Sequence, residues 1–140
     1  MRDIVFVRGA PASGKSTWIR EHHLEPYTIS SDDVRLMFSC PEADPITGEE
    51  HISQRNDSMV WRFIEDTLLL RMRAGQFIVL DAQNIDLTRW SKLAHKYRYR
   101  MWYKSFDVSE EECLRRNAAR PPLRQVPEFV IQSSVVRLNN

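Results

Sequence analysis

The stretch IVFVRGAPASGKST, residues 4–17, is the most informative part of the sequence. Its first four residues are β-branched or aromatic and predict a buried strand, which the following glycine ends. Gly9 and Gly14 stand five positions apart and are followed by Lys15 and Ser16. This spacing, between a strand and a helix, is the Walker A pattern.

A loop of this kind binds phosphate groups through its backbone. Its glycines adopt angles that a Cβ forbids, so successive N–H groups turn inward at the positive end of the next helix. We expect Lys15 to reach the β- and γ-phosphates of a nucleotide and the Ser16 hydroxyl to bind Mg²⁺. The residues expected around the nucleotide are Gly9, Ala10, Pro11, Ala12, Ser13, Gly14, Lys15, Ser16 and Thr17.

The composition indicates one domain of balanced charge. A chain of 140 residues is long enough to bury a core, and we expect residues 1–140 to form a single domain. Lys and Arg number 20 against 19 Asp and Glu, so any attraction to nucleic acid must be local. Cys40 and Cys113 lack a metal-binding spacing, and no apolar run approaches a membrane span. We therefore expect a cytoplasmic protein with no membrane partner.

Strands and helices alternate in the predicted secondary structure. Apolar runs predict strands at residues 2–7, 27–30, 77–81 and 101–108. Helices are predicted at residues 15–22, 31–38, 50–74, 87–99 and 127–138, with another from Ser109. The alternation predicts an α/β fold with a parallel sheet and right-handed crossovers.

Three details of these elements are open to test. Ser31 is a plausible N-cap, Gly75 a plausible helix-ending residue, and residues 41–49 should form a loop. Trp18 is expected in the core rather than stacked on a ligand. The apolar positions of the long helix should include Met59, Phe63, Leu69 and Leu70.

The segment SSDDVR, residues 30–35, follows the second predicted strand. One interpretation is that Asp32 and Asp33 only complement the dipole of the next helix. We favour a functional role for at least one, because Asp32 and Arg35 share a helix face just past a strand's carboxyl end. Open α/β sheets place their ligands at that edge.

The third predicted strand ends in Asp81, as a Walker B strand does. Such an Asp holds Mg²⁺ directly or through water, although an Asp here can instead cap the next turn. Ala82 stands where many ATP-hydrolysing P-loop proteins carry a Glu that activates water. The absence of that Glu favours transfer to an acceptor other than water.

Arg116, Arg120 and Arg124 surround the Pro121-Pro122 pair. Because proline ends a helix, these arginines should lie on a loop that can fold over bound phosphates. We call this segment, residues 116–124, the arginine lid.

Together these motifs resemble the kinase domain of the phage and bacterial 5′-polynucleotide kinases, within the P-loop kinase superfamily. The matching stretches are GAPASGKSTW (9–18), SSDDVR (30–35), DAQN (81–84), Arg116-Asn117 with Arg120, and Val126-Pro127. The resemblance implies a four-stranded parallel sheet in the order 2-3-1-4, flanked by helices and closed by the arginine lid.

The resemblance also implies a phosphotransferase that uses ATP, or another nucleoside triphosphate, and needs Mg²⁺. It would move the γ-phosphate of ATP to the 5′-hydroxyl end of DNA or RNA, as in nucleic-acid repair. Asp32 would be the general base, Arg35 would contact the acceptor's terminal phosphate, and Arg120 would contact the donor phosphates. The implied catalytic set is Lys15, Asp32, Arg35 and Arg120, with Arg116 also at the nucleotide, and Ser16 and Asp81 as metal-site candidates.

Three positions depart from the family pattern. Ala12 replaces a frequent Gly, Ser31 a common Arg and Gln83 a common Thr, so the acceptor pocket can differ. The sequence lacks the C-terminal phosphatase domain of some members, so we expect phosphorylation only. One alternative is a small-molecule kinase acting on a nucleoside, modified base or sugar. The other is a non-catalytic nucleotide-binding switch, which would need neither an acceptor base nor an arginine lid.

Overall fold

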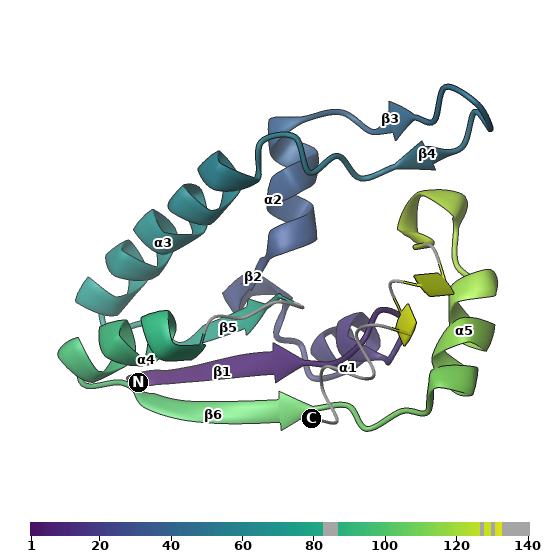
Figure 1. The fold of residues 1–140 in the computed structure, drawn as a ribbon. Coiled ribbons are helices and arrows are strands. Elements are labelled where there is room, and N and C mark those ends of the chain that lie inside the picture. Colours follow the sequence, from purple (N-terminus) through teal and green to yellow (C-terminus); the bar gives the residue numbers. More distant parts are fainter. Residues whose placement is uncertain (83–86, 127, 130, 133–140) are drawn as a thin grey trace.

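A parallel sheet of four strands forms the centre of the computed structural model, which describes residues 1–82, 87–126, 128–129 and 131–132 (Figure 1). Its strands run in the order β2-β5-β1-β6. They are β1 (Asp3–Arg8), β2 (Thr28–Ser30), β5 (Ile78–Asp81) and β6 (Arg100–Ser105). Counted among these four strands alone, the order is 2-3-1-4, which confirms the predicted topology.

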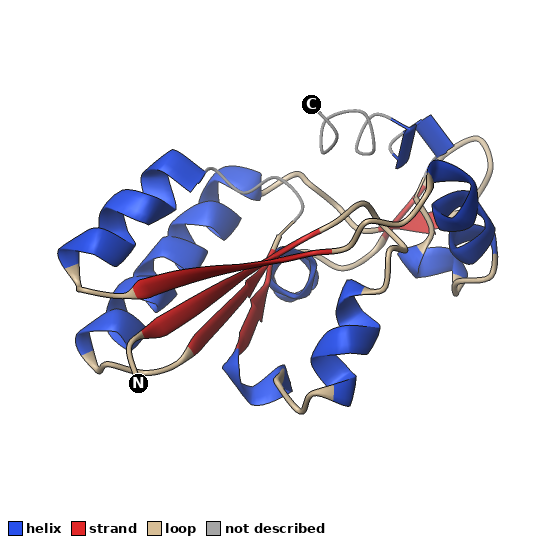
Figure 2. Ribbon diagram, turned by 90° about the horizontal axis from the view of Figure 1, so that it is seen from below, coloured by secondary structure: helices blue, strands red, loops and turns tan. Residues whose placement is uncertain are grey.

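Helices cover both faces of the sheet (Figure 2). The helices of the chain are α1 (Lys15–Glu21), α2 (Ser31–Phe38), α3 (Asp57–Arg73), α4 (Leu87–Lys96) and α5 (Glu110–Ala118), of which α5 lies beyond the carboxyl ends of the strands (Figure 1). Ile4 and Phe6 of β1 pack in one core cluster with α3 and α4, whereas Val7 packs in another with Ile19 of α1. Trp18 lies against this second cluster, as expected. The central strand is therefore buried on both sides, as a parallel strand with helical crossovers must be.

The long helix α3 begins at Asp57, seven residues after the predicted start at residue 50. Glu50–His51 instead form strand β4, which pairs antiparallel with β3 (Glu42–Ala43). The predicted loop at residues 41–49 is thus most of a hairpin, and the predicted helix start was wrong. Backbone pairing with the preceding strand takes these residues out of the helix.

The buried face of α3 also differs from the prediction. Its buried residues are Val60, Ile64, Leu68 and Met72, each four positions after the last. Met59 and Leu70, expected among the apolar positions, are exposed by 60% and 67%. Apolar residues occur on more than one face of α3, and the continuous four-residue stripe is the one that packs against the sheet.

The helix ends test the predicted caps. Ser30, rather than Ser31, is the N-cap of α2, and Ser31 is its buried first residue. Ser109 caps α5 as expected, accepting a hydrogen bond from the Glu112 N–H at 3.2 Å. Gly75 follows α3 with φ +68°, the left-handed value expected of a glycine there.

For α1, α4 and β6, the observed first and last residues agree with the predicted ones to within three positions. Most of the predicted last helix, residues 127–138, lies outside the described residues, as do Gln83, Asn84 and Pro127. Within the described ranges, no helix has both the length and the apolar character needed to cross a bilayer.

Candidate active site

The predicted site residues gather at the carboxyl edge of the sheet. Asp81, the last residue of β5, is in register with Val7 of β1 on one side and Ser30 of β2 on the other. The Walker A loop, residues 9–17, follows β1, and helix α2 follows β2 directly. Parallel pairing therefore brings the phosphate loop, Asp81 and the start of α2 to one edge.

In the Walker A loop Gly14 has the left-handed backbone expected of it, whereas Gly9 is needed for space and has no positive φ. Gly14 has φ +105° and precedes the first turn of α1. A Cβ on Gly9 would lie 2.4 Å from the Ser13 hydroxyl oxygen, so no larger residue fits without displacement. The Ser13 hydroxyl is buried without a hydrogen-bond partner among the described residues. Ala12 has φ +66°, an uncommon angle for a residue with a side chain.

Lys15 and Asp81 face each other at the base of the site. Lys15 Nζ lies 3.6 Å from Asp81 Oδ1, and each side chain is only 13% exposed. Burial raises the pKa of the Asp81 carboxyl above its ordinary value, while the charge of Lys15 opposes that shift. The pair places a buried positive charge at the beginning of α1, where phosphates are expected.

A magnesium ion fits the oxygen donors of this edge. Ser16, on the first turn of α1, supplies a hydroxyl, and Asp81 supplies a carboxylate. Among the described residues, no three or more His, Cys, Asp or Glu cluster as a metal site. Mg²⁺ commonly takes one or two protein ligands and completes its shell with waters and substrate phosphates, so the Ser16 hydroxyl and the Asp81 carboxylate would be sufficient to hold it.

Helix α2 presents its two carboxylates differently. Asp32 Oδ1 accepts a hydrogen bond from Arg35 Nη1 at 2.9 Å, and the Asp32 side chain is half exposed. Asp33 is 68% exposed, and its Oδ1 lies 3.6 Å from Arg124 Nη2 of the lid. The i, i+3 spacing therefore selects Asp32 as the partner of Arg35, as predicted.

Arg35 has a second partner that the sequence did not reveal. Its Nε and Nη2 donate to the two carboxylate oxygens of Asp57 at 2.9 and 3.0 Å. Although burial opposes the charge, hydrogen bonds to Asp57 and Asp32 hold the pKa of Arg35 above its ordinary value. Asp57 is the first residue of α3, and only the packing of α2 against α3 brings it to Arg35.

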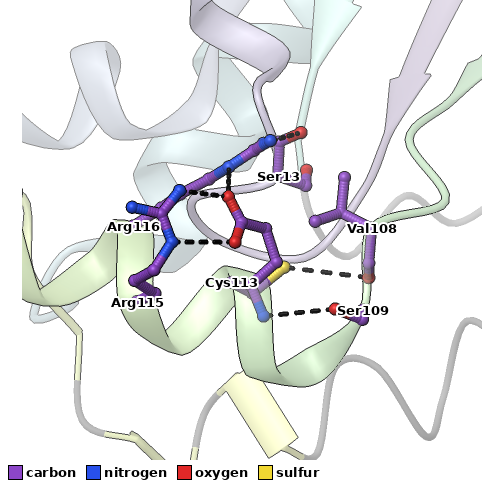
Figure 3. Close-up of polar contacts among 7 residues, drawn as sticks. Ser13, Val108, Ser109, Cys113, Arg115 and Arg116 are labelled. Atoms are coloured by element: carbon purple, nitrogen blue, oxygen red, sulfur yellow. Dashed lines mark hydrogen bonds and ion pairs between the residues drawn. The ribbon is translucent and has the colours of Figure 1, made fainter.

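The lid arginine Arg116 is bonded to the Walker A loop (Figure 3). Its Nη1 donates to the Ser13 carbonyl at 3.2 Å, and its Nε donates to Glu112 Oε1 at 2.9 Å. Arg115 also pairs with Glu112. Arg116 therefore lies beside the Walker A loop, held by Glu112, an acid that was not among the predicted site residues. It lies within helix α5 rather than on the loop on which the sequence placed it.

Arg120 is partly buried with one end unsatisfied. Its Nη1 is buried without a hydrogen-bond partner among the described residues. Burial lowers the pKa of Arg120, the charge of Asp32 opposes this, and Arg124 adds to it. The charge of Asp32 thus acts on the Arg120 guanidinium, in the direction that favours its protonated form.

The lid closes against the hairpin. Its 3-10 helix η2 (Pro122–Arg124) packs against β4 (Glu50–His51). The site is therefore framed by the Walker A loop, the start of α2, the hairpin and the lid.

Comparisons with solved structures agree with this architecture. A chain of the Pnkp1/Rnl/Hen1 RNA repair complex matches with a TM-score of 0.74 and 24% identity over 98% of this chain. A chain of a second Pnkp1/Rnl/Hen1 complex matches with a TM-score of 0.61 and 24% identity over 81%. A candidate kinase from Chloroflexus aurantiacus j-10-fl matches with a TM-score of 0.67 and 16% identity over 98%.

The matched shares of the other chains differ. The alignment covers 44% and 38% of the two chains from the Pnkp1 complexes and 80% of the candidate kinase. At these identities the matches establish the P-loop kinase fold that the sequence predicts.

The family model described as "AAA domain" matches residues 4–139, nearly the whole chain. The protein is a member of the AAA domain family.

Proposed function

We propose that the protein is a 5′-hydroxyl polynucleotide kinase that transfers the γ-phosphate of ATP to the end of DNA or RNA. The observation that supports this most is Asp32, a half-exposed carboxylate that is bonded to Arg35 at the edge bearing the phosphate loop. A hydroxyl is a weak nucleophile, and a carboxylate within reach can accept its proton. Ala82 after the Walker B-like strand leaves no acid there to activate water instead.

In the proposed reaction a proton passes from the 5′-hydroxyl to Asp32, and a phosphoryl group passes from ATP to the 5′-oxygen. Asp32 accepts the proton of the 5′-hydroxyl group while the oxygen of that hydroxyl forms a bond to the γ-phosphorus. The bond between that phosphorus and the β–γ bridging oxygen breaks, and ADP leaves. A positioned base of this kind contributes about 10²- to 10⁴-fold to the rate.

Positive charge on the donor side stabilises the transferring group. Lys15 and the loop N–H groups hold the phosphates, and Arg120 has a buried N–H group without a protein partner in the described region. When bound by Ser16 and Asp81, Mg²⁺ would neutralise part of the phosphate charge. These charges act where negative charge is redistributed during transfer.

The comparisons support the acceptor assignment indirectly. Two matched chains come from Pnkp1/Rnl/Hen1 complexes, one of them described as an RNA repair complex. The candidate kinase is matched over more of its own length but carries no stated substrate. The alternatives of a small-molecule kinase and a nucleotide-binding switch are therefore outcomes of the same test.

The test follows transfer from ATP labelled in the γ-phosphate. The acceptors are a 5′-hydroxyl oligonucleotide, the same oligonucleotide with a 5′-phosphate, a nucleoside, and buffer alone, with Lys15→Ala as the inactive control. We expect label only on the 5′-hydroxyl oligonucleotide. Labelling of the nucleoside alone would indicate a small-molecule kinase, and ATP binding without transfer to any acceptor would indicate a switch.

A further inference from the structure

The side chain of Arg35 is held by two carboxylates from two helices. Arg35 Nε and Nη2 donate to Asp57 of α3, and Nη1 donates to Asp32 of its own helix. The Arg35 side chain is only 13% exposed, whereas Asp32 is 50% exposed. The guanidinium, largely shielded from solvent, thus connects Asp57 to the more exposed Asp32, which is the proton acceptor of the proposed reaction.

The geometry of the Asp57 contact fixes the plane of the guanidinium. Two parallel N–H···O bonds define both the position and the orientation of the group, which a single contact does not. The contact with Asp32 is single. Without Asp57, the guanidinium could turn about the Asp32 contact, and the Asp32 carboxylate would lose its fixed support.

Arg35 has N–H groups that neither Asp57 nor Asp32 uses, and these can bind a substrate. A guanidinium carries five N–H groups, and three are used by Asp57 and Asp32. The other two lie on Nη1 and Nη2, one on each. An anionic group of an acceptor can bind these two, provided that the plane is already set.

We propose that Asp57 is a positioning residue for phosphoryl transfer, acting through Arg35 on the proton acceptor Asp32. This inference rests on the proposed kinase function and extends it to a residue on a different helix. Asp57 does not touch the reacting atoms. Its role is to hold Arg35 in the one orientation that supports Asp32 and presents the remaining N–H groups to the acceptor.

The test is a double-mutant cycle in single-turnover phosphorylation of a 5′-hydroxyl oligonucleotide. Asp57→Asn keeps the size of the side chain but removes its charge, and it is measured in the wild-type and the Arg35→Gln backgrounds. Asp66→Asn is the matched control, because Asp66 is an exposed acid on the same helix. ATP affinity and the melting temperature are measured for every variant.

The positioning role predicts a loss that depends on Arg35. Asp57→Asn should slow transfer on the order of 10²-fold in the wild-type background. In the Arg35→Gln background the same substitution should change the rate by no more than about twofold, which is the usual scatter of such measurements, because the residue through which Asp57 acts has already been removed. Asp57→Asn should leave ATP affinity near wild type, and Asp66→Asn should leave the transfer rate near wild type. An equal loss in both backgrounds, or a loss fully explained by weaker ATP binding or unfolding, would overturn the inference.

These outcomes remain separate from the fate of the proposed function. A wild-type protein that phosphorylates no 5′-hydroxyl end would contradict the proposed function, and the role of Asp57 with it. An active wild-type protein whose Asp57→Asn variant is fully active would contradict the positioning role alone.

Discussion

The side chain of Arg116 donates from Nη1 to the backbone carbonyl of Ser13 at 3.2 Å, across 103 positions of sequence. Its Nε is held by Glu112 at the same time, at 2.9 Å. A Cβ added to Gly14 would lie 3.5 Å from Arg116 Nη1, so the guanidinium lies directly beside the loop backbone. Helix α5, which leads into the lid, and the phosphate loop are thus joined by a direct hydrogen bond.

Replacing Glu112 by Gln should make the stability of the fold depend less on pH in the acid range. Arg115 and then Arg116 lower the pKa of Glu112 from 4.5 to about 2. A carboxyl whose pKa is lower in the folded state stabilises that state above its unfolded pKa, and this stabilisation is lost as pH falls. Melting curves should show Glu112→Gln below wild type at neutral pH, with the difference shrinking as pH falls from about 4.5 to about 2.

The control for that experiment is Glu111→Gln, which removes a neighbouring exposed acid of the same helix turn. It should leave the acid dependence close to that of wild type. A difference between Glu112→Gln and wild type that stays constant through this pH range would show that the ion pairs of Glu112 do not stabilise the fold.

Arg120→Met should raise stability while removing activity. The Arg120 Nη1 is buried without a partner among the described residues, and burial lowers the pKa of the group. Relief of such an unsatisfied buried group should raise the free energy of unfolding by about 1 kcal/mol. Turnover should fall far more than the affinity for the oligonucleotide, because the lost charge acts on the donor phosphates. A change confined to the Michaelis constant of the oligonucleotide would place Arg120 in the acceptor site instead.

Ala12→Gly should stabilise the protein by about 0.5–1 kcal/mol, because left-handed angles strain a residue with a Cβ more than they strain glycine. The φ of Ala12 is +66°. Arg98→Gly is a matched control, since Arg98 has φ +61° just after α4, away from the loop. Chemical denaturation should show a gain for both variants. A gain for Arg98→Gly with a loss for Ala12→Gly would show that the Ala12 methyl group stabilises the loop by packing.

The sheet and its edge were predictable because their signals are local. The apolar runs at β1 and β5, and the turn residues after them, each determine a strand without reference to the rest of the chain. Lys15, Asp32, Arg35 and Asp81 were also found by local spacing, and the structure brings them to one edge.

The features that were missed depend on contacts distant in sequence. Asp57 and Arg35 are 22 positions apart, and only the packing of α2 on α3 joins them. The start of α3 was missed because Glu50–His51 pair with Glu42–Ala43 rather than continuing a helix. Asp57 lies in the first turn of α3, but the helix was predicted to start at residue 50, which placed Asp57 in the helix interior and gave no sequence signal for a role at its N-terminus.

The most direct test of the proposed mechanism compares Asp32→Asn with Asp33→Asn. Asn keeps the size of either side chain but cannot take a proton, and only Asp32 bonds to Arg35 while Asp33 lies near Arg124. The measurement is the steady-state rate of 5′-end phosphorylation of an oligonucleotide, alongside ATP binding and a thermal melt. Asp32→Asn should lose about 10²- to 10⁴-fold in turnover while still binding ATP and Mg²⁺. Asp33→Asn should keep most of its turnover, with a stability change of about 0.3–1 kcal/mol. Equal and mild losses in the two variants would contradict the assignment of Asp32 as the base.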